Sequence, residues 1–505
     1  MLRRLSLTRP TESSHDGFVR DRQNNKVMLG FLFVAILLIC HVLISKLGIA
    51  AFTLFLVLLF FGLLYAFVSF RFLVVPFTVA ILSVGGFRFL WSVSMPGLPD
   101  LYIDRVAMIW LVAVFSVKTV AERKTLRAPF LLDILLVVNA LYLAVSFLLN
   151  DSTYFSLWTR SYLVPYAAYF MAKNIVVTQR YMRFLLILLA TLGMYYAVTS
   201  IAEKFSITQL IWPKSILYIQ TMWWGRSNGP FSHAPLFGTV QGMILPVYLY
   251  LIATARNKLI RVFSYLMLAM GLTGLYFTYT RGSWLAGIVA LLVTIALNRR
   301  HYLKISAPAI ALLPLIAVFV LGAGNDKMMK DRVDDDQTIT ARLGTAVTAI
   351  RMWQDHPIFG VGFFRYRNVR DQYIDPVEVP VYGTIRFANF RHTSIHDIYL
   401  GPLAETGLVG TFLQLAIYIL IIRAIVRHVR RRDVPPHFRL FLLPVFTGLS
   451  VGYLVGGISI DYRFFSMVGT MFYSAAGIVY GYNGRVAVSS ESNIVTDERW
   501  LDDEA

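Results

Sequence analysis

Apolar runs of about 18 or more residues recur along most of the chain, separated by short polar segments. At a rise of about 1.5 Å per residue, each run is long enough to cross a hydrocarbon core about 30 Å thick as a helix. We therefore predict an all-α, polytopic transmembrane helical bundle of about fourteen spans. The predicted spans occupy residues 27–45, 47–68, 71–90, 105–121, 129–149, 161–178, 183–202, 233–253, 263–280, 283–298, 305–322, 397–422, 440–459 and 464–481.

One long polar stretch, residues 323–396, interrupts this pattern in the body of the chain. It divides the predicted bundle into a larger part, 27–322, and a C-terminal part, 397–481. Two tails complete the predicted organisation. Residues 1–26 form a basic tail and residues 482–505 an acidic tail, and both are predicted to be cytoplasmic.

The long polar stretch contains a predicted helix over residues 338–356. Its apolar residues recur at the spacing of one helix face, which favours a helix that lies on the membrane or caps the bundle: Ile339, Leu343, Val347, Ile350 and Trp353. Arg342 and Arg351 are about 180° apart around such a helix. We therefore expect only one of them to face a ligand, with the other solvated.

Composition agrees with a membrane protein and excludes a soluble globule of this length. Apolar residues make up 57% of the 505 residues, charged residues 15%, and the mean hydropathy is +0.63. The formal charge of +19 comes largely from Lys and Arg clusters at alternate loops and at the N-terminal tail. Because cytoplasmic loops concentrate these residues, we place both termini inside and the 323–396 loop outside, in contact with anionic lipid but not with nucleic acid.

Two short segments on the predicted outer face carry candidate chemistry. Arg226 and His233 flank a Gly-Pro turn, where they either mark the mouth of a cavity or belong to an interfacial aromatic belt. Arg281 lies in an almost loopless break between two apolar runs. It either extends to the lipid headgroups or is held as a bidentate ligand for a diphosphate.

A third segment, residues 393–410, begins where the outer loop re-enters the membrane. Asp397 is placed to cap the next helix, which is sufficient as a structural explanation. His396 titrates near neutral pH and is suited to orient or deprotonate a hydroxyl group. The single cysteine, Cys40, excludes an intrachain disulfide and a cysteine metal cluster. Asp334, Asp335 and Asp336 are interpreted as a solvated turn.

Taken in order, four stretches resemble the O-antigen ligase and polymerase superfamily of bacterial inner-membrane glycan enzymes. They are Arg226 to Phe231, Thr280 to Trp284, Arg342 with His356 to Gly362, and His396 to Leu400 continuing through Ala404 to Gly410. Asp397 stands where the family usually has asparagine, and the serine before Arg281 is shifted or absent. The resemblance covers about residues 220–425.

This resemblance implies a GT-C-like membrane glycosyltransferase. The expected reaction is inverting, metal-independent transfer of a glycan from a polyprenyl-diphosphate-linked oligosaccharide to an acceptor hydroxyl, without a cofactor, at the outer face of the bacterial inner membrane. Arg281, Arg342 and His396 are the predicted catalytic residues. The predicted substrate-binding residues are Arg226, His233, Arg391, Asp397 and Tyr399.

The acceptor stays open between two activities. A polymerase of exopolysaccharide or O-antigen joins repeat units that are still carried on lipid, whereas a ligase transfers the glycan to lipid A-core. The two departures from the family pattern favour the polymerase. A transporter or flippase of a different class predicts repeated halves and charges deep within spans, and neither feature is evident in the sequence. A scaffolding membrane protein leaves the order of the motifs unexplained.

Overall fold

A computed structural model describes the chain at residues 53–54, 56–86, 92–93, 101–123, 130–150, 152–218, 225–305, 337–374, 376–379, 383–385 and 395–482. The chain divides into two units, Met1–Arg71 and Phe72–Ala505. In the first unit the described part is an apolar helix, Leu56–Arg71. The second unit holds every predicted functional residue that the structure describes, so the geometry below is that of the second unit alone.

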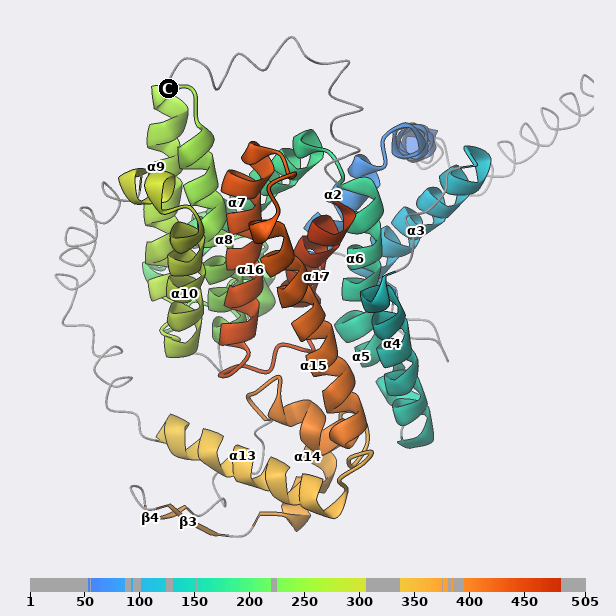
Figure 1. Cartoon of the computed structure of the whole chain (residues 1–505), viewed down its shortest axis with the longest axis vertical. Helices are drawn as coiled ribbons and strands as arrows, with labels where there is room; N and C mark the ends of the chain where they lie inside the picture. Colours follow the sequence, from blue (N-terminus) through green and yellow to red (C-terminus); the bar gives the residue numbers. More distant parts are fainter. Residues whose placement is uncertain are drawn as a thin grey trace, which may run out of the picture. The chain divides into compact units, whose positions relative to one another are not determined.

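The described part of the second unit is almost entirely helical (Figure 1). Its helices before the outer loop are α2 (Val74–Val84), α3 (Ile103–Ala121), α4 (Leu131–Asn150), α5 (Phe155–Trp158), α6 (Val164–Ile175), α7 (Gln179–Lys204), α8 (Ala234–Thr254), α9 (Lys258–Tyr276) and α10 (Arg281–Leu297). The later helices are α13 (Gln337–Asp355), α14 (Tyr366–Val369), α15 (Leu400–Arg430), α16 (Leu443–Gly456) and α17 (Ser466–Gly481).

The strands are short and form two antiparallel pairs. β1 (Ser92–Val93) pairs with β2 (Leu101–Tyr102), and β3 (Val377–Val379) pairs with β4 (Gly383–Ile385). In the second pair, Val377 lies opposite Ile385 and Val379 opposite Gly383. The predicted all-helical class is therefore confirmed, since these strands are minor additions outside the bundle's helices.

Every predicted span that falls on described residues contains a helix, but fewer helices are long and apolar enough to cross a membrane by themselves. Within the described part there are six: α4, α7, α8, α9, α15 and the segment Phe438–Gly456 that includes α16. A seventh is added if Leu56–Arg71 and α2 are one broken span. The predicted span 27–45, and the span 305–322 beyond its first residue, lie outside the described residues. The count of about fourteen therefore stays a prediction.

Local sequence fixes where several helices begin. Thr178 precedes α7 and its hydroxyl accepts a hydrogen bond from the Tyr181 backbone N–H over 3.3 Å. Asn257 caps α9 in the same manner, with its Oδ1 2.8 Å from the Leu259 nitrogen. Each cap satisfies a backbone donor that the first helical turn leaves without a partner, and so defines the helix start.

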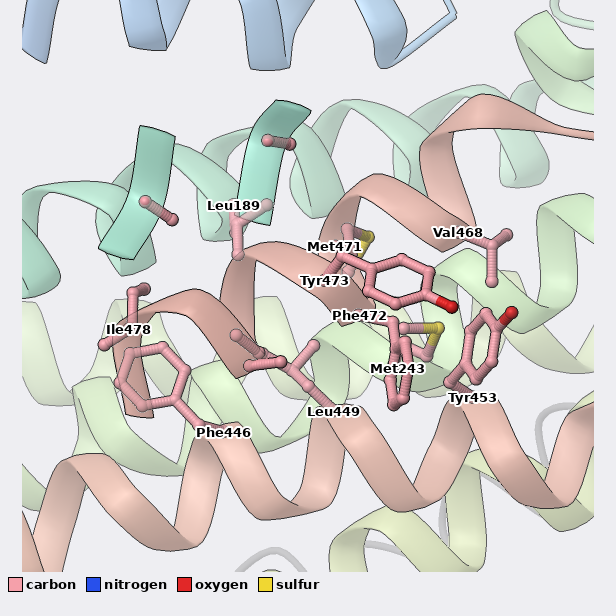
Figure 2. Packing of buried hydrophobic residues seen from close by; sticks show 14 of the residues in the cluster. Leu189, Met243, Phe446, Leu449, Tyr453, Val468, Met471, Phe472, Tyr473 and Ile478 are labelled. Carbon is pink, nitrogen blue, oxygen red and sulfur yellow. The ribbon is translucent and has the colours of Figure 1, made fainter. Parts of the chain in front are cut away.

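The core lies between α8, α16 and α17, where large side chains pack from all three helices. Tyr453 and Phe472 stack with their ring centroids 4.1 Å apart at 12°, and Met243 of α8 lies beside them (Figure 2). All three side chains are buried. This packing joins the C-terminal helices to the middle of the chain, which brings the connection between α16 and α17 close to the start of α10.

A buried ion pair joins α4 to α6. Lys173 in the last turn of α6 binds Asp133 in the first turn of α4. The Asp133 carboxylate also accepts hydrogen bonds from the Tyr169 hydroxyl at 2.6 Å and from the Phe130 nitrogen at 2.7 Å. Because the pair joins two helix ends and the carboxylate has three hydrogen-bond partners, the pair has a structural explanation.

Helix α13 confirms the helix predicted inside the polar stretch 323–396. It contacts the beginning of α15 and lies across that end of the helix (Figure 1). Its buried residues are Gly344, Thr345, Thr348, Ala349 and Met352. The predicted apolar stripe is instead partly open, with Ile350 38% exposed. Ala349 and Met352 pack in one cluster with Ala404 of α15, which apolar periodicity alone did not indicate.

Candidate active site

Arg281 is the first residue of α10 and follows a four-residue turn. Tyr279 in this turn has a positive φ of 46°, and the nitrogen of Trp284 donates to the Thr280 carbonyl oxygen over 3.0 Å. The next residue, Gly282, lies against the α16–α17 connection, where an added Cβ would be 1.8 Å from Ser459 Oγ. The predicted tight break is thus confirmed, and close contact with Ser459 holds the start of α10.

Arg226 is buried and binds the turn that precedes Arg281. Its Nε donates to the Thr278 carbonyl oxygen over 3.0 Å, and its Nη2 donates to the Thr280 hydroxyl. This guanidinium therefore stabilises the position of Arg281. Its predicted role in binding substrate stays a prediction.

Glu203, at the end of α7, fixes the segment that carries Arg226. Its Oε2 accepts hydrogen bonds from the nitrogens of Asn228 at 2.8 Å and Gly229 at 3.0 Å. We did not single out this residue from the sequence. The available signal was an acidic side chain at the C-terminal end of an apolar helix, where a buried carboxylate requires backbone or cationic partners.

His233 caps α8 through its ring. Nδ1 accepts a hydrogen bond from the Leu236 nitrogen over 3.1 Å, and the ring packs on Phe465 with centroids 5.1 Å apart. Burial, and then the charges of His396 and Arg226, lower the pKa of His233 to about 4. The ring is therefore neutral at pH 7, with its proton on Nε2 because Nδ1 is the acceptor.

The three predicted catalytic residues come from three separate segments and interact electrostatically. Burial and the neighbouring charge of Arg281 lower the pKa of Arg342 on α13. Burial and the charge of Arg342 lower the pKa of His396, while Asp461 opposes that shift. Arg351 on the same helix has a different partner, since its Nη1 donates to the Tyr373 carbonyl oxygen over 3.2 Å. Arg351 is thus half-buried and not solvated as we expected, and which of the two arginines faces a ligand stays a prediction.

Asp397 and Tyr399 hold the beginning of α15. Asp397 Oδ1 accepts from the nitrogens of Tyr399 at 2.6 Å and Leu400 at 2.7 Å, so this carboxylate is a cap. Burial raises its pKa, although these two backbone N–H groups oppose the shift. The Tyr399 hydroxyl donates to the Leu454 carbonyl oxygen over 2.7 Å. Substrate binding by either residue stays a prediction, and Arg391 lies outside the described residues.

A buried charge cluster lies beside His396 and was not anticipated from the sequence. Arg463 donates from Nε and Nη2 to both carboxylate oxygens of Asp461 at 2.9 and 2.8 Å. Its Nη1 donates to Glu405 Oε2 of α15 at 3.1 Å. We call these three residues the outer triad. Its signal in the sequence was an Asp-Tyr-Arg segment between two apolar spans, which we interpreted only as a connection.

The stretches His356–Gly362 and Ala404–Gly410 bind each other. Helix α15 breaks at Gly407, whose φ is 63° and ψ −160°. On one side of the break, Val361 and Gly362 donate to the carbonyl oxygens of Ala404 and Glu405 at 2.9 Å each. On the other side, Leu408 and Val409 donate to the carbonyl oxygens of Pro357 and Ile358 at 2.8 and 3.2 Å. These bonds satisfy backbone groups that the break exposes.

Metal binding has no support among the residues that the structure describes, where no group of three or more His, Cys, Asp or Glu side chains is arranged to hold an ion. The triplet Asp334–Asp336 lies outside the described residues. The predicted absence of a metal and of a cofactor stays a prediction.

Comparison with known protein families matches residues 265–415 to the family described as O-antigen ligase. This segment runs from α9 to the middle of α15 and includes Arg281, Arg342 and His396. Comparison with curated proteins finds no match. The apolar helices make the chain a membrane protein, and its residues 265–415 are similar to the O-antigen ligase family.

Proposed function

We propose that this protein is a membrane glycosyltransferase that moves a glycan from a polyprenyl-diphosphate-linked donor to an acceptor hydroxyl. The site is the one formed by Arg281, Arg342 and His396. In this proposal the reaction takes place at the outer face of the bacterial inner membrane, and both termini are cytoplasmic. The basic end of α15, with Arg427, His428 and Arg430 in its last turn, lies opposite the end that carries His396, which supports this orientation.

The observation that most supports this proposal is that two arginines, one from α10 and one from α13, lie near each other. Arg281 and Arg342 are close enough that the positive charge of Arg281 lowers the pKa of Arg342, and Arg342 is also half-buried. Two like charges held together in a protein repel each other unless an anion lies between them. A diphosphate carries the charge and the oxygen atoms that two guanidinium groups bind well.

His396 has the protonation state required of a base. Because its pKa lies below 6.5, most of the imidazole is neutral at pH 7 and has a nitrogen lone pair available. In the proposed step, the acceptor oxygen attacks the anomeric carbon while His396 takes the hydroxyl proton. The bond between the anomeric carbon and the diphosphate oxygen breaks, and the lipid diphosphate leaves with the electron pair.

The arginines supply charge stabilisation at the place where negative charge develops. The leaving diphosphate gains charge as its bond to the sugar breaks, and two fixed guanidinium groups stabilise that charge without reorganisation. Attack in line with the leaving group inverts the anomeric carbon. We propose on this basis an inverting reaction that uses arginines where other glycosyltransferases use a metal ion.

Fewer observations bear on the choice of acceptor than on the site. We propose polymerisation of exopolysaccharide or O-antigen repeat units, with ligation to lipid A-core as the alternative that the family description favours. Asp397 does not discriminate between them, because its carboxylate accepts two backbone hydrogen bonds that an asparagine oxygen at the same position can also accept. The shifted serine before Arg281 is therefore the one departure that still favours the polymerase.

The proposal is tested with purified protein and a lipid-linked glycan donor. Arg281→Ala, Arg342→Ala and His396→Ala should each abolish transfer while expression and membrane insertion are retained. Arg351→Ala is the matched control, since Arg351 lies on the same helix as Arg342 and binds the Tyr373 carbonyl oxygen instead. It should retain most of the activity. Full transfer activity of the His396 variant would remove the proposed base.

The acceptor is decided by the product formed from lipid-linked repeat units alone. Chain growth without added lipid A-core supports the polymerase, and transfer that requires lipid A-core supports the ligase. Movement of intact donor across a vesicle membrane, with no new glycosidic bond, would support the transporter instead.

A further inference from the structure

Helix α15 presents a continuous apolar stripe that no other described part of the protein covers. The stripe follows a spacing of three and four residues, which is one face of a helix. Its members are all between 38% and 72% exposed: Leu408, Phe412, Leu415, Ile419, Ile422, Val426 and Val429. A surface of this kind on a membrane-spanning helix faces the hydrocarbon of the bilayer.

The stripe stops where the helix breaks. One turn before Leu408, the residues Ala404 and Glu405 are buried, and the Val361–Gly362 backbone is hydrogen-bonded to them. The outer loop thus replaces lipid at this level of α15. The side chains that continue the apolar surface therefore belong to the loop and not to the helix.

Ile358 and Phe359 occupy the position where the stripe would continue. The carbonyl oxygens of Pro357 and Ile358 accept the backbone N–H groups of Leu408 and Val409, which fixes the loop beside the first residue of the stripe. Ile358 is 56% exposed and Phe359 65% exposed. Two large apolar side chains are therefore held open on a loop that is rigidly bound through its backbone.

The same loop also contacts the end of α4, another membrane-spanning helix. The Phe363 nitrogen donates to Ser146 Oγ over 3.0 Å. Near this contact, Leu148 and Leu149 of α4 are 62% and 80% exposed. The tip Pro357–Phe359 is thus part of a loop that is hydrogen-bonded to α4 and α15, and both helices have exposed apolar side chains near these bonds.

The length of α15 gives the depth of this tip. About twenty helical residues cross a hydrocarbon core. Counting about twenty residues back from Arg427, at the basic end, reaches the break at Gly407. Leu408 therefore lies at the opposite boundary of the hydrocarbon, and Ile358 and Phe359 lie at that boundary with it.

We propose that the loop tip Pro357–Phe359 inserts into the lipid leaflet at this boundary, with Ile358 and Phe359 in contact with acyl chains. The tip follows directly after α13, so its insertion anchors the end of that helix at the membrane surface. This inference concerns the partner of a surface and holds whether or not the proposed glycan transfer is correct.

The depth of the tip can be measured with spin labels. Cys40, the one cysteine of the sequence, is replaced by serine, and single cysteines are introduced as Phe359→Cys, Phe412→Cys and Asn368→Cys. Each variant is labelled and reconstituted in phosphatidylethanolamine–phosphatidylglycerol vesicles. Relaxation by oxygen, which concentrates in lipid, is compared with relaxation by a water-soluble nickel chelate. Position 412 serves as the lipid reference and exposed position 368 as the water reference.

The label at position 359 should resemble that at position 412, with stronger relaxation by oxygen than by the chelate. A water-like ratio equal to that at position 368 overturns the proposal. Low relaxation by both agents, together with dipolar broadening between labels, also overturns it because a second copy of the chain would then cover the tip.

An experiment on the unsubstituted protein avoids any loss of folding in the variants. Vesicles that contain phospholipid with a diazirine in the acyl chain are irradiated, and adducts are located by mass spectrometry. Adducts on the peptide that contains Ile358 and Phe359 are expected. Adducts confined to the spanning helices, with none on this peptide, overturn the proposal.

Discussion

Arg463 donates a hydrogen bond to Glu405 over 3.1 Å, and this buried ion pair joins the N-terminal end of α15 to the connection between α16 and α17. The same connection carries Ser459, which contacts Gly282, and Asp461, whose charge acts on His396. One short segment therefore contacts the start of α10 and the start of α15. This segment therefore sets the position of α10, which begins with Arg281, relative to α15, which follows His396.

Removing the cation of the outer triad should strongly destabilise the protein. Arg463→Met leaves the carboxylates of Glu405 and Asp461 without their cation, and both ion pairs join side chains that are 3% exposed. We expect the free energy of unfolding to fall by about 3–5 kcal/mol. Chemical denaturation in detergent micelles measures this change.

The matched control is Arg431→Met. Arg431 pairs with Asp433 on the surface, where the two side chains are 35% and 62% exposed. An ion pair in this environment contributes about 0–1 kcal/mol. Equal losses in the two variants would show that burial of the triad does not determine its contribution.

Gly282→Ala should disturb the beginning of α10. The added Cβ would lie 1.8 Å from Ser459 Oγ, so one of the two segments must move. We expect a loss of about 1–3 kcal/mol in stability. Glycan transfer should also fall, because Arg281 is the preceding residue. Thermal unfolding and transfer assays measure the two effects.

The double variant Gly282→Ala, Ser459→Gly removes the atoms that clash and should restore both properties. Gly62→Ala is a control that should not destabilise the protein, since Gly62 is helical and no atom lies within 4 Å of the added Cβ. Failure of the double variant to recover would mean that Gly282 acts through something other than contact with Ser459.

Gly407→Ala should destabilise the break in α15 for two reasons. Gly407 has a φ of 63° and a ψ of −160°, a conformation essentially restricted to glycine that costs an alanine about 1–3 kcal/mol, and its Cβ would lie 2.3 Å from the Ile358 carbonyl oxygen. Gly383→Ala separates these effects, because Gly383 has a φ of +66° and nothing within 4 Å of the added Cβ. Thermal unfolding should show a larger loss at position 407. Similar losses at both positions would exclude a contribution from the loop.

His233 should make stability depend on pH below neutrality. Its pKa is about 4 in the folded protein and about 6.5 when unfolded, so the unfolded state binds more protons between these values. The stability that the neutral ring provides is present above pH 6.5 and is lost as the pH falls toward 4. The full difference corresponds to about 3 kcal/mol.

His233→Asn keeps an acceptor for the Leu236 nitrogen but does not titrate. Denaturation at a series of pH values from 7 to 4 should therefore show a smaller slope in this variant. His396 titrates in the same direction, so some slope should remain. An unchanged slope would mean that His233 is not the buried neutral group described here.

The pH dependence of transfer reports on His396. Because its pKa lies below 6.5, kcat/KM should stay high at pH 6.5 and fall only as the pH drops further. Asp461 raises this pKa by its charge. Asp461→Asn should consequently lower the pKa of His396 and move the acidic limb to lower pH. A shift to higher pH would contradict the proposed interaction.

Much of the helical framework follows from the sequence by itself. Long apolar runs predict helices at each described span, because a chain in hydrocarbon must satisfy its backbone groups internally. The tight turn before Arg281 and the helix in the outer loop were also predicted correctly. These features depend on residues that are near one another in the chain. The spacing of apolar residues in such a segment indicates which side of it is buried or faces lipid.

The three predicted catalytic residues lie in separate stretches of sequence. The order of these stretches along the chain resembles a known family, and this resemblance could be recognised without knowing which residues contact one another. Only the tertiary structure decided that Arg226 binds the turn beside Arg281, that His233 and Asp397 are caps, and that Arg463 joins Glu405 to Asp461. It alone decided that the Pro357–Gly362 backbone bonds across the break at Gly407. Local sequence patterns indicate which face of a segment is buried. They do not indicate a hydrogen-bond partner far along the chain, because that partner is determined by how all the helices pack together.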